Sequence, residues 1–67
     1  MEQGWIKIYT SDDFFKSELV RQVLTDYDLS AILTNKQGFP YRIGEVEVYI
    51  HPDNFHQAIE IIVKNEL

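Results

Sequence analysis

The chain has 67 residues, no cysteine and a formal net charge of −5, which describes a single domain, residues 1–67, near the lower size limit for unaided folding. The lack of cysteine excludes disulfides, thiolate metal sites and cysteine nucleophiles, and the excess of acids disfavours nucleic acids and anionic membranes as partners. The sequence has neither the roughly 18 consecutive apolar residues of a membrane span nor a basic signal-peptide start, so we expect a cytoplasmic protein.

The first predicted element is a half-buried strand at residues 5–10, where side chains alternate and β-branched and aromatic types are frequent. Ile6 and Ile8 are expected on its inner face. The outer face then carries two aromatic rings and one cation, which are Trp5, Tyr9 and Lys7.

Residues 14–27 predict an amphipathic helix. Ser11, Asp12 and Asp13 precede it, and their side-chain oxygens are typical acceptors for the free N–H groups of a first helical turn. The apolar positions recur at three- and four-residue spacing, as one helical face requires. They are Phe15, Leu19, Val20, Val23, Leu24 and Tyr27.

Two further strands are predicted at residues 29–34 and 45–50. In the first of these, the core side chains are expected to be Leu29, Ala31 and Leu33, with Ile32 on the opposite face. The second alternates most clearly in the chain, with an aliphatic inner face and an outer face of Glu45, Glu47 and Tyr49.

A second helix is predicted to begin at residues 51–53, because Pro52 at a first helical position loses no hydrogen bond that the helix would make. Its expected buried stripe comprises Phe55, Ala58, Ile59, Ile62 and Val63.

The resulting order of strand, helix, strand, strand, helix is the ferredoxin-like α+β plan without its final strand. We expect a three-stranded sheet in the order 1-3-2 with both helices on one face, the first and third strands parallel and the second antiparallel to the third. The first strand is then an open edge, which proteins usually cover. The helix-free face carries more aromatic area than a solvated face needs. Its candidate contact residues are Trp5, Lys7, Tyr9 and Tyr49.

Five short blocks carry a family resemblance: WIKIYTS at 5–11, ELV at 18–20, ILTNKQ at 32–37, GEVEVYI at 44–50 and PD at 52–53. Across almost the whole chain they resemble the small bacterial family of prokaryotic signal-transducing proteins, a domain of unknown function with a fold similar to that of PII nitrogen-regulatory proteins. The resemblance implies a PII-like fold and partner contacts through the loop between the second and third strands, here residues 35–44. The PII trimer and its nucleotide site are not carried over, because this loop is shorter and the fourth strand is absent.

The same loop is the clearest local signal for binding, because it holds Lys36 and Arg42 and no acid. Two cations and backbone N–H groups suit a small anion or a partner's carboxylate. The candidate residues are Lys36, Gly38, Tyr41, Arg42 and Gly44. The alternative is that the two cations keep the loop solvated while its apolar side chains close the end of the core.

His51 and His56 raise the question of a metal site. Their five-residue separation does not place both on one helical face, unlike the i, i+4 pair of a zinc helix, so we expect no metal ligands. The near-adjacent carboxylates are attributed to helix capping and solvation rather than to acid–base catalysis. They are Asp12, Asp13, Asp26 and Asp28.

No nucleophile elbow, phosphate-binding loop or catalytic triad is present in the sequence, so we expect neither an enzyme nor a bound cofactor. RNA stacking on the aromatic face is opposed by Glu45 and Glu47. The leading hypothesis is therefore a regulatory or protein-interaction module that contacts a partner, or a second copy in a homodimer, through the loop and through the first-strand edge or the helix-free face. A small-anion or nucleotide sensor using Lys36 and Arg42 is the alternative.

Overall fold

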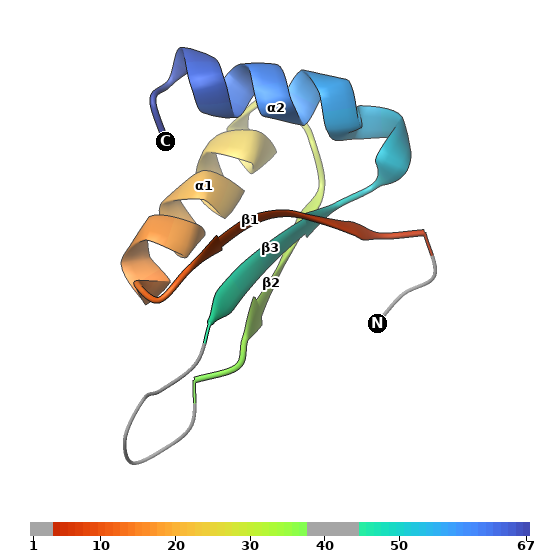
Figure 1. Cartoon of the computed structure of the whole chain (residues 1–67). Coiled ribbons are helices and arrows are strands. Elements are labelled where there is room, and N and C mark those ends of the chain that lie inside the picture. The colour runs from red at the N-terminus through yellow and green to blue at the C-terminus, as the bar shows by residue number, and fades with distance from the viewer. Residues whose placement is uncertain (1–3, 38–44) are drawn as a thin grey trace.

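The computed structural model describes residues 4–37 and 45–67, and the order of elements predicted from the sequence is confirmed (Figure 1). Strand β1 (Ile6–Ser11) leads to helix α1 (Phe14–Asp26) and strand β2 (Ala31–Asn35). Strand β3 (Val46–Ile50) is followed by a 3₁₀ turn, η1 (Pro52–Asn54), and helix α2 (Phe55–Lys64). The fold is α+β.

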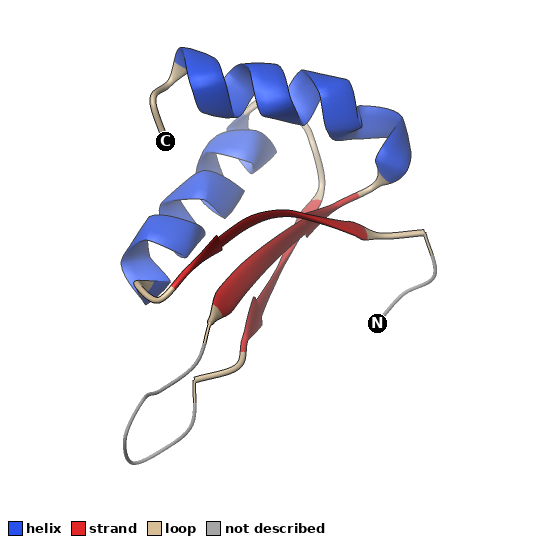
Figure 2. Cartoon of the chain, in the orientation of Figure 1, coloured by secondary structure: helices blue, strands red, loops and turns tan. Residues whose placement is uncertain are grey.

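The sheet has the predicted order β1-β3-β2, with β3 in the centre (Figure 2). Strand β3 runs antiparallel to both neighbours, so the expectation that the first and third strands are parallel is wrong. The physical reason is that a connection through a helix returns the chain to the starting end of the sheet, so β2 runs parallel to β1. The chain then reverses into β3, which inserts between them.

Strand β1 contains a bulge. Lys7 pairs with Tyr49, but the next paired residue of β1 is Tyr9, which lies opposite Val48. One extra residue therefore lies between two paired positions and changes the alternation of side chains along the strand. Tyr9 packs against the hydrophobic core, so the expectation that it shares the face of Lys7 is also wrong.

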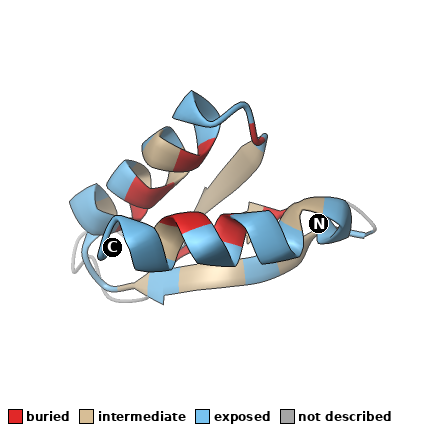
Figure 3. Ribbon diagram, turned by 90° about the horizontal axis from the view of Figure 1, so that it is seen from above, coloured by how far each residue is buried: buried red, intermediate tan, exposed pale blue. Residues whose placement is uncertain are grey.

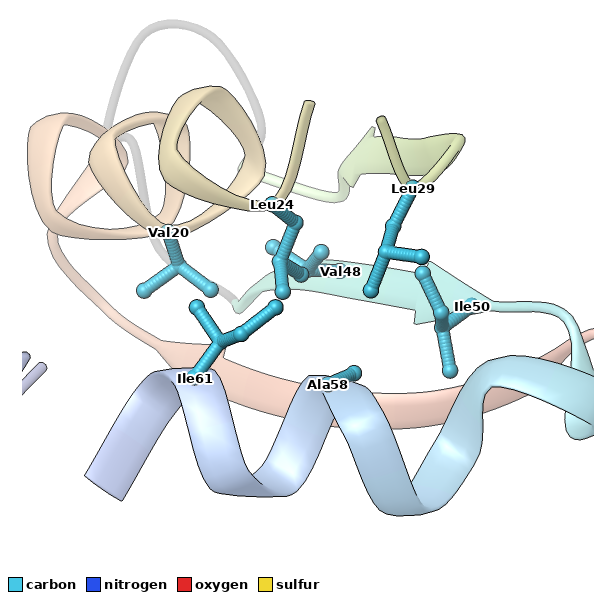
Figure 4. Packing of buried hydrophobic residues seen from close by; sticks show 7 residues of the cluster. All are labelled: Val20, Leu24, Leu29, Val48, Ile50, Ala58 and Ile61. Atoms are coloured by element: carbon cyan, nitrogen blue, oxygen red, sulfur yellow. The ribbon is translucent and has the colours of Figure 1, made fainter. Parts of the chain in front are cut away.

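The core lies between the sheet and the two helices, which cover the same face (Figure 3). Seven buried side chains converge there from α1, the segment before β2, β3 and α2 (Figure 4). They are Val20, Leu24, Leu29, Val48, Ile50, Ala58 and Ile61. The sequence pattern correctly placed most of them inward.

Side-chain hydrogen bonds cap the start of α1 and the start of η1, the turn that precedes α2. The carboxylate of Asp13 accepts from the backbone N–H groups of Phe15 and Lys16, at 2.9 and 3.4 Å, so Asp13 caps α1 as the sequence suggested. Ahead of α2, the ring Nδ1 of His51 accepts from the N–H of Asp53 at 3.1 Å, and Pro52 occupies the first turn of η1.

Helix α2 buries only part of the predicted stripe: Ala58 is buried and Ile62 packs against the core as predicted, and Ile61, which was not predicted, is buried as well. In contrast, Phe55, Ile59 and Val63 are 36%, 37% and 70% exposed. These three side chains are spaced by four residues and share one side of the helix. They are called the apolar stripe below. Within the described residues, no helix is long and apolar enough to cross a membrane.

Candidate interaction surfaces

The helix-free face of the sheet is organised around Glu47. This residue lies on the central strand, in a row with Thr10 of β1 and Thr34 of β2, and is only 4% exposed although no helix covers it. Side chains from three positions make polar contacts to its carboxylate. A glutamate predicted to be solvated is therefore the centre of a polar network.

The carboxylate of Glu47 receives three partners. Lys7 lies 3.1 Å from Oε2, Lys36 lies 3.1 Å from Oε1, and the hydroxyl of Tyr49 donates to Oε1 at 2.9 Å. We call these four residues the Glu47 cluster. Lys7 and Tyr49 were predicted as contact residues of the sheet face and Lys36 as a loop residue, so the structure joins two predicted sets through a residue that belonged to neither.

Hydrogen bonds within the cluster shift the pKa values of Glu47, Lys7 and Tyr49 away from neutrality. The Tyr49 hydroxyl, followed by the Lys36 and Lys7 ammonium groups, lowers the pKa of Glu47 from 4.5 to about 2. Hydrogen bonding to the same carboxylate raises the pKa of Lys7 and that of Tyr49. A general acid or base works best with a pKa near the working pH. The Glu47 cluster is consequently suited to a fixed ion network and not to proton transfer.

The remaining predicted contact residues do not join the cluster. Trp5 lies against His51, with the rings edge-on and their centroids 6.0 Å apart. Tyr9 lies on the helix-covered side, in a groove of about 290 Å³ near the end of α2. Four predicted loop residues lie outside the residues that the structure describes. They are Gly38, Tyr41, Arg42 and Gly44.

A second surface lies at the outer side of β1. In the described part of the chain, β1 pairs only with β3, so its other backbone edge has no strand beside it. Helix α2 lies along β1 (Figure 3). Across a shallow groove α2 turns Gln57, Glu60 and Lys64 toward α1, which directs the apolar stripe away from α1 and toward the β1 edge.

The outer side of β2 differs. Helix α1 contacts all three strands, and β2 most extensively. Lys16 and Tyr27 line the grooves that this helical segment shares with the C-terminal part of the chain. The side of α1 that turns away from α2 carries Glu18 and Arg21, whose guanidinium donates to the carboxylate, with a 2.8 Å contact from Nε. The β2 edge is therefore flanked by an ion pair rather than by apolar side chains.

His51 and His56 contact neighbouring residues of the chain. Across residues 4–37 and 45–67, no group of three or more histidine, cysteine, aspartate or glutamate side chains is placed to hold a metal ion. His51 instead caps η1, and the ring of His56 lies beside that of Phe55, with the centroids 6.2 Å apart.

Comparison with known proteins adds no assignment: no protein-family model, curated protein or solved structure matches the chain.

Proposed function

We propose that the protein is a non-enzymatic interaction module that binds a protein partner by adding a strand to the outer edge of β1. The observation that carries this proposal is the combination, at one edge, of unpaired backbone and the apolar stripe of α2. The resemblance to a signal-transducing family with a PII-like fold supports a regulatory role for such contacts.

Strand addition needs two features. Backbone N–H and C=O groups along an open edge supply hydrogen bonds, and an adjacent apolar surface supplies affinity and selects side chains. The edge of β1 offers the first and the apolar stripe offers the second. Open strands are a liability that proteins usually blunt with charges, prolines, bulges or a covering helix or loop. Of these devices, β1 carries the bulge between Lys7 and Tyr9. In β1 the only charged side chain is Lys7, and its ammonium group is held by Glu47 on the helix-free face.

The proposal that the module is non-enzymatic is supported by the pKa shifts within the Glu47 cluster. This cluster brings more ionisable groups together than the other polar contacts found among the described residues, and the pKa shifts of Glu47, Lys7 and Tyr49 move these three groups away from the range useful for proton transfer near neutral pH. The polar groups of Lys7, Lys36 and Tyr49 each pair with the carboxylate of Glu47. They stabilise the sheet rather than present a reactive group.

Binding of a small anion at Lys7 and Lys36 is a second candidate. Both ammonium groups reach the same carboxylate, so both could also contact one phosphate or sulfate that displaces Glu47. Titration with sulfate and ATP tests this candidate through the side-chain signals of Lys7 and Lys36. Shifts in the lysine signals support it, and unchanged signals at millimolar anion contradict it.

The test of strand addition is an NMR titration with a capped peptide of alternating valine and threonine. We expect chemical-shift changes along β1 and in the methyl groups of Ile59 and Val63, with little change along β2. The matched control is the same peptide N-methylated at alternate residues, which cannot make the ladder of hydrogen bonds. Equal shifts with both peptides, or shifts at β2 alone, contradict the proposal.

A further inference from the structure

We propose that the strand added to β1 is the β1 strand of a second copy of this chain, related to the first by a two-fold axis at the edge. This proposal rests on the proposed function and names the partner. The two three-stranded sheets would form one continuous six-stranded sheet, and the apolar stripes of the two α2 helices would face each other. Four features of the structure support the proposal.

The first feature is the relative direction of β1 and α2. Ile6, at the start of β1, pairs with Ile50, which leads through η1 into α2. At the other end, Glu66 and Leu67 lie beyond α2 and line a groove with Tyr9. Helix α2 therefore runs in the same direction as β1. A two-fold axis that makes the two β1 strands antiparallel also makes the two α2 helices antiparallel.

The second feature is the even spacing of the apolar stripe along α2. Ile59 lies midway between Phe55 and Val63, one turn from each. In an antiparallel pair of α2 helices centred on Ile59, each Ile59 meets its counterpart, and each Phe55 meets Val63 of the other copy. A two-fold interface must be complementary to itself, and this spacing satisfies that requirement.

The third feature is the charge of the surface that would form the contact. Each copy carries a net charge of −5, so self-association is possible only where like charges stay apart. The apolar stripe contains no charged residue, and β1 contributes Lys7, which is paired with Glu47 on the face away from the helices. Glu60 and Lys64 line the groove toward α1 instead. The proposed contact is therefore neutral.

The fourth feature is the distance available between the two α2 helices when the two β1 strands pair. Strands paired across an edge are about 4.8 Å apart, whereas packed helices need about 8–10 Å between axes. Each α2 must therefore lie inward of its own β1. Ala58 and Ile61 pack in one cluster with Val48 and Ile50 of the central strand, which draws α2 inward from the edge. The helices can then meet through their stripes without preventing β1 from pairing.

The experiment is a charge exchange across the proposed axis, measured by sedimentation equilibrium from micromolar to millimolar protein. The wild-type chain is expected to dimerise. Phe55→Glu and Val63→Lys are each expected to weaken dimerisation at least tenfold, because each places a charge against an apolar side chain. An equimolar mixture of the two variants should form a heterodimer, since Glu at 55 of one copy then meets Lys at 63 of the other.

The double variant Phe55→Glu/Val63→Lys should likewise regain dimerisation, with two ion pairs across the axis. Within one helix the two positions are eight residues, or about 12 Å, apart, so the charges cannot pair inside one copy. The matched control is Phe15→Glu, which adds the same charge at a residue of α1 that is 79% exposed and outside the interface. It should dimerise like the wild type.

A wild-type chain that stays monomeric at millimolar concentration overturns this inference. So do single variants that dimerise normally, or a mixture that forms no heterodimer. Circular dichroism establishes that each variant is folded, and Val63→Lys provides the safest reading because Val63 is the most exposed member of the stripe. If the wild type is monomeric but the valine–threonine peptide still binds β1, the self-association inference fails and the interaction module stands. If neither occurs, both fail.

Discussion

The two edges of the sheet have the same backbone chemistry but different surroundings. Strand β1 and strand β2 each pair with β3 on one side only, within the residues that the structure describes. A helix flanks each edge. At β1 the flanking side chains form the apolar stripe, whereas at β2 they include the Glu18–Arg21 ion pair. An edge becomes a docking surface through the side chains beside it, because charges there oppose the approach of a second strand.

The Glu47 cluster connects these two edges to the central strand. Lys7 comes from β1 and Lys36 directly follows β2, and both reach the carboxylate of Glu47 on β3. On the helix-free face, each edge thus contributes one lysine to the same carboxylate. The difference between them arises on the helix-covered side.

The largest expected effect lies in the core that both edges share. Leu24 is fully buried, so Leu24→Ala is expected to lower the free energy of unfolding by about 2–5 kcal/mol. A domain of 67 residues has about 3–10 kcal/mol in total, so much of the protein should be unfolded. Chemical denaturation measures the change. A loss below 1 kcal/mol would show that the two helices do not pack around Leu24 as described.

A smaller effect is expected at the junction between β1 and α1. Asp13→Ala removes the cap that accepts from two backbone N–H groups and should lower the free energy of unfolding by about 1 kcal/mol. Asp12→Ala is the matched control, because the side chain of Asp12 makes no cap bond. Chemical denaturation of both variants gives the comparison, and equal losses would contradict the assignment of Asp13 as the cap.

Glu47→Gln should alter the dependence of stability on pH. The folded-state pKa of Glu47, about 2, lies below the ordinary 4.5, so its ion network stabilises the fold above 4.5 and loses that contribution as the pH falls to about 2. The stability difference between wild type and variant should therefore be constant near neutral pH and shrink across this window. Thermal melting at several pH values measures it, with the exposed Glu45→Gln as control. A pH-independent difference would contradict the network.

The smallest effect on stability is expected at the β2 edge. There the charged flanking side chains can be replaced by apolar ones, so that β2 resembles β1. Glu18→Leu/Arg21→Leu removes an i, i+3 pair worth about 0.2–0.5 kcal/mol. It also gives β2 an apolar flank. In the Val63→Lys background, where the β1 contact is weakened, this double change should create new concentration-dependent association through β2. Sedimentation measures this association, and a chain that remains monomeric would show that side chains flanking an edge do not decide its use.

The sequence predicts much of the fold because local patterns determine it. Alternation in residues 45–50 indicates the central strand, and the acids before residue 14 indicate the start of α1. The β1 bulge could not be read in this way, because nothing in residues 5–10 records the register with β3. Strand direction follows instead from the order β1-β3-β2 together with the helical connection from β1 to β2, which makes these two strands parallel and β3 antiparallel to both.

The candidate surfaces are less visible in the sequence for the same reason. Lys7, Lys36 and Tyr49 were predicted as contact residues, but only the cross-strand register brings them to Glu47. The apolar stripe was predicted as buried because periodicity identifies an apolar helix face without showing how far the sheet extends beneath it. The sheet formed by the described residues has three strands, so no further strand of this part of the chain lies beneath the outer side of that helix face.

Amide hydrogen exchange of β1 and β2, measured on the wild-type chain at low and high protein concentration, tests the central claim most directly. The claim is that the β1 edge, and not the β2 edge, accepts a strand from a second copy. Outward-facing amides of β1 should exchange more slowly as the concentration rises, while those of β2 keep their rates. Exchange in β1 that is independent of concentration, or slowing confined to β2, would contradict the claim.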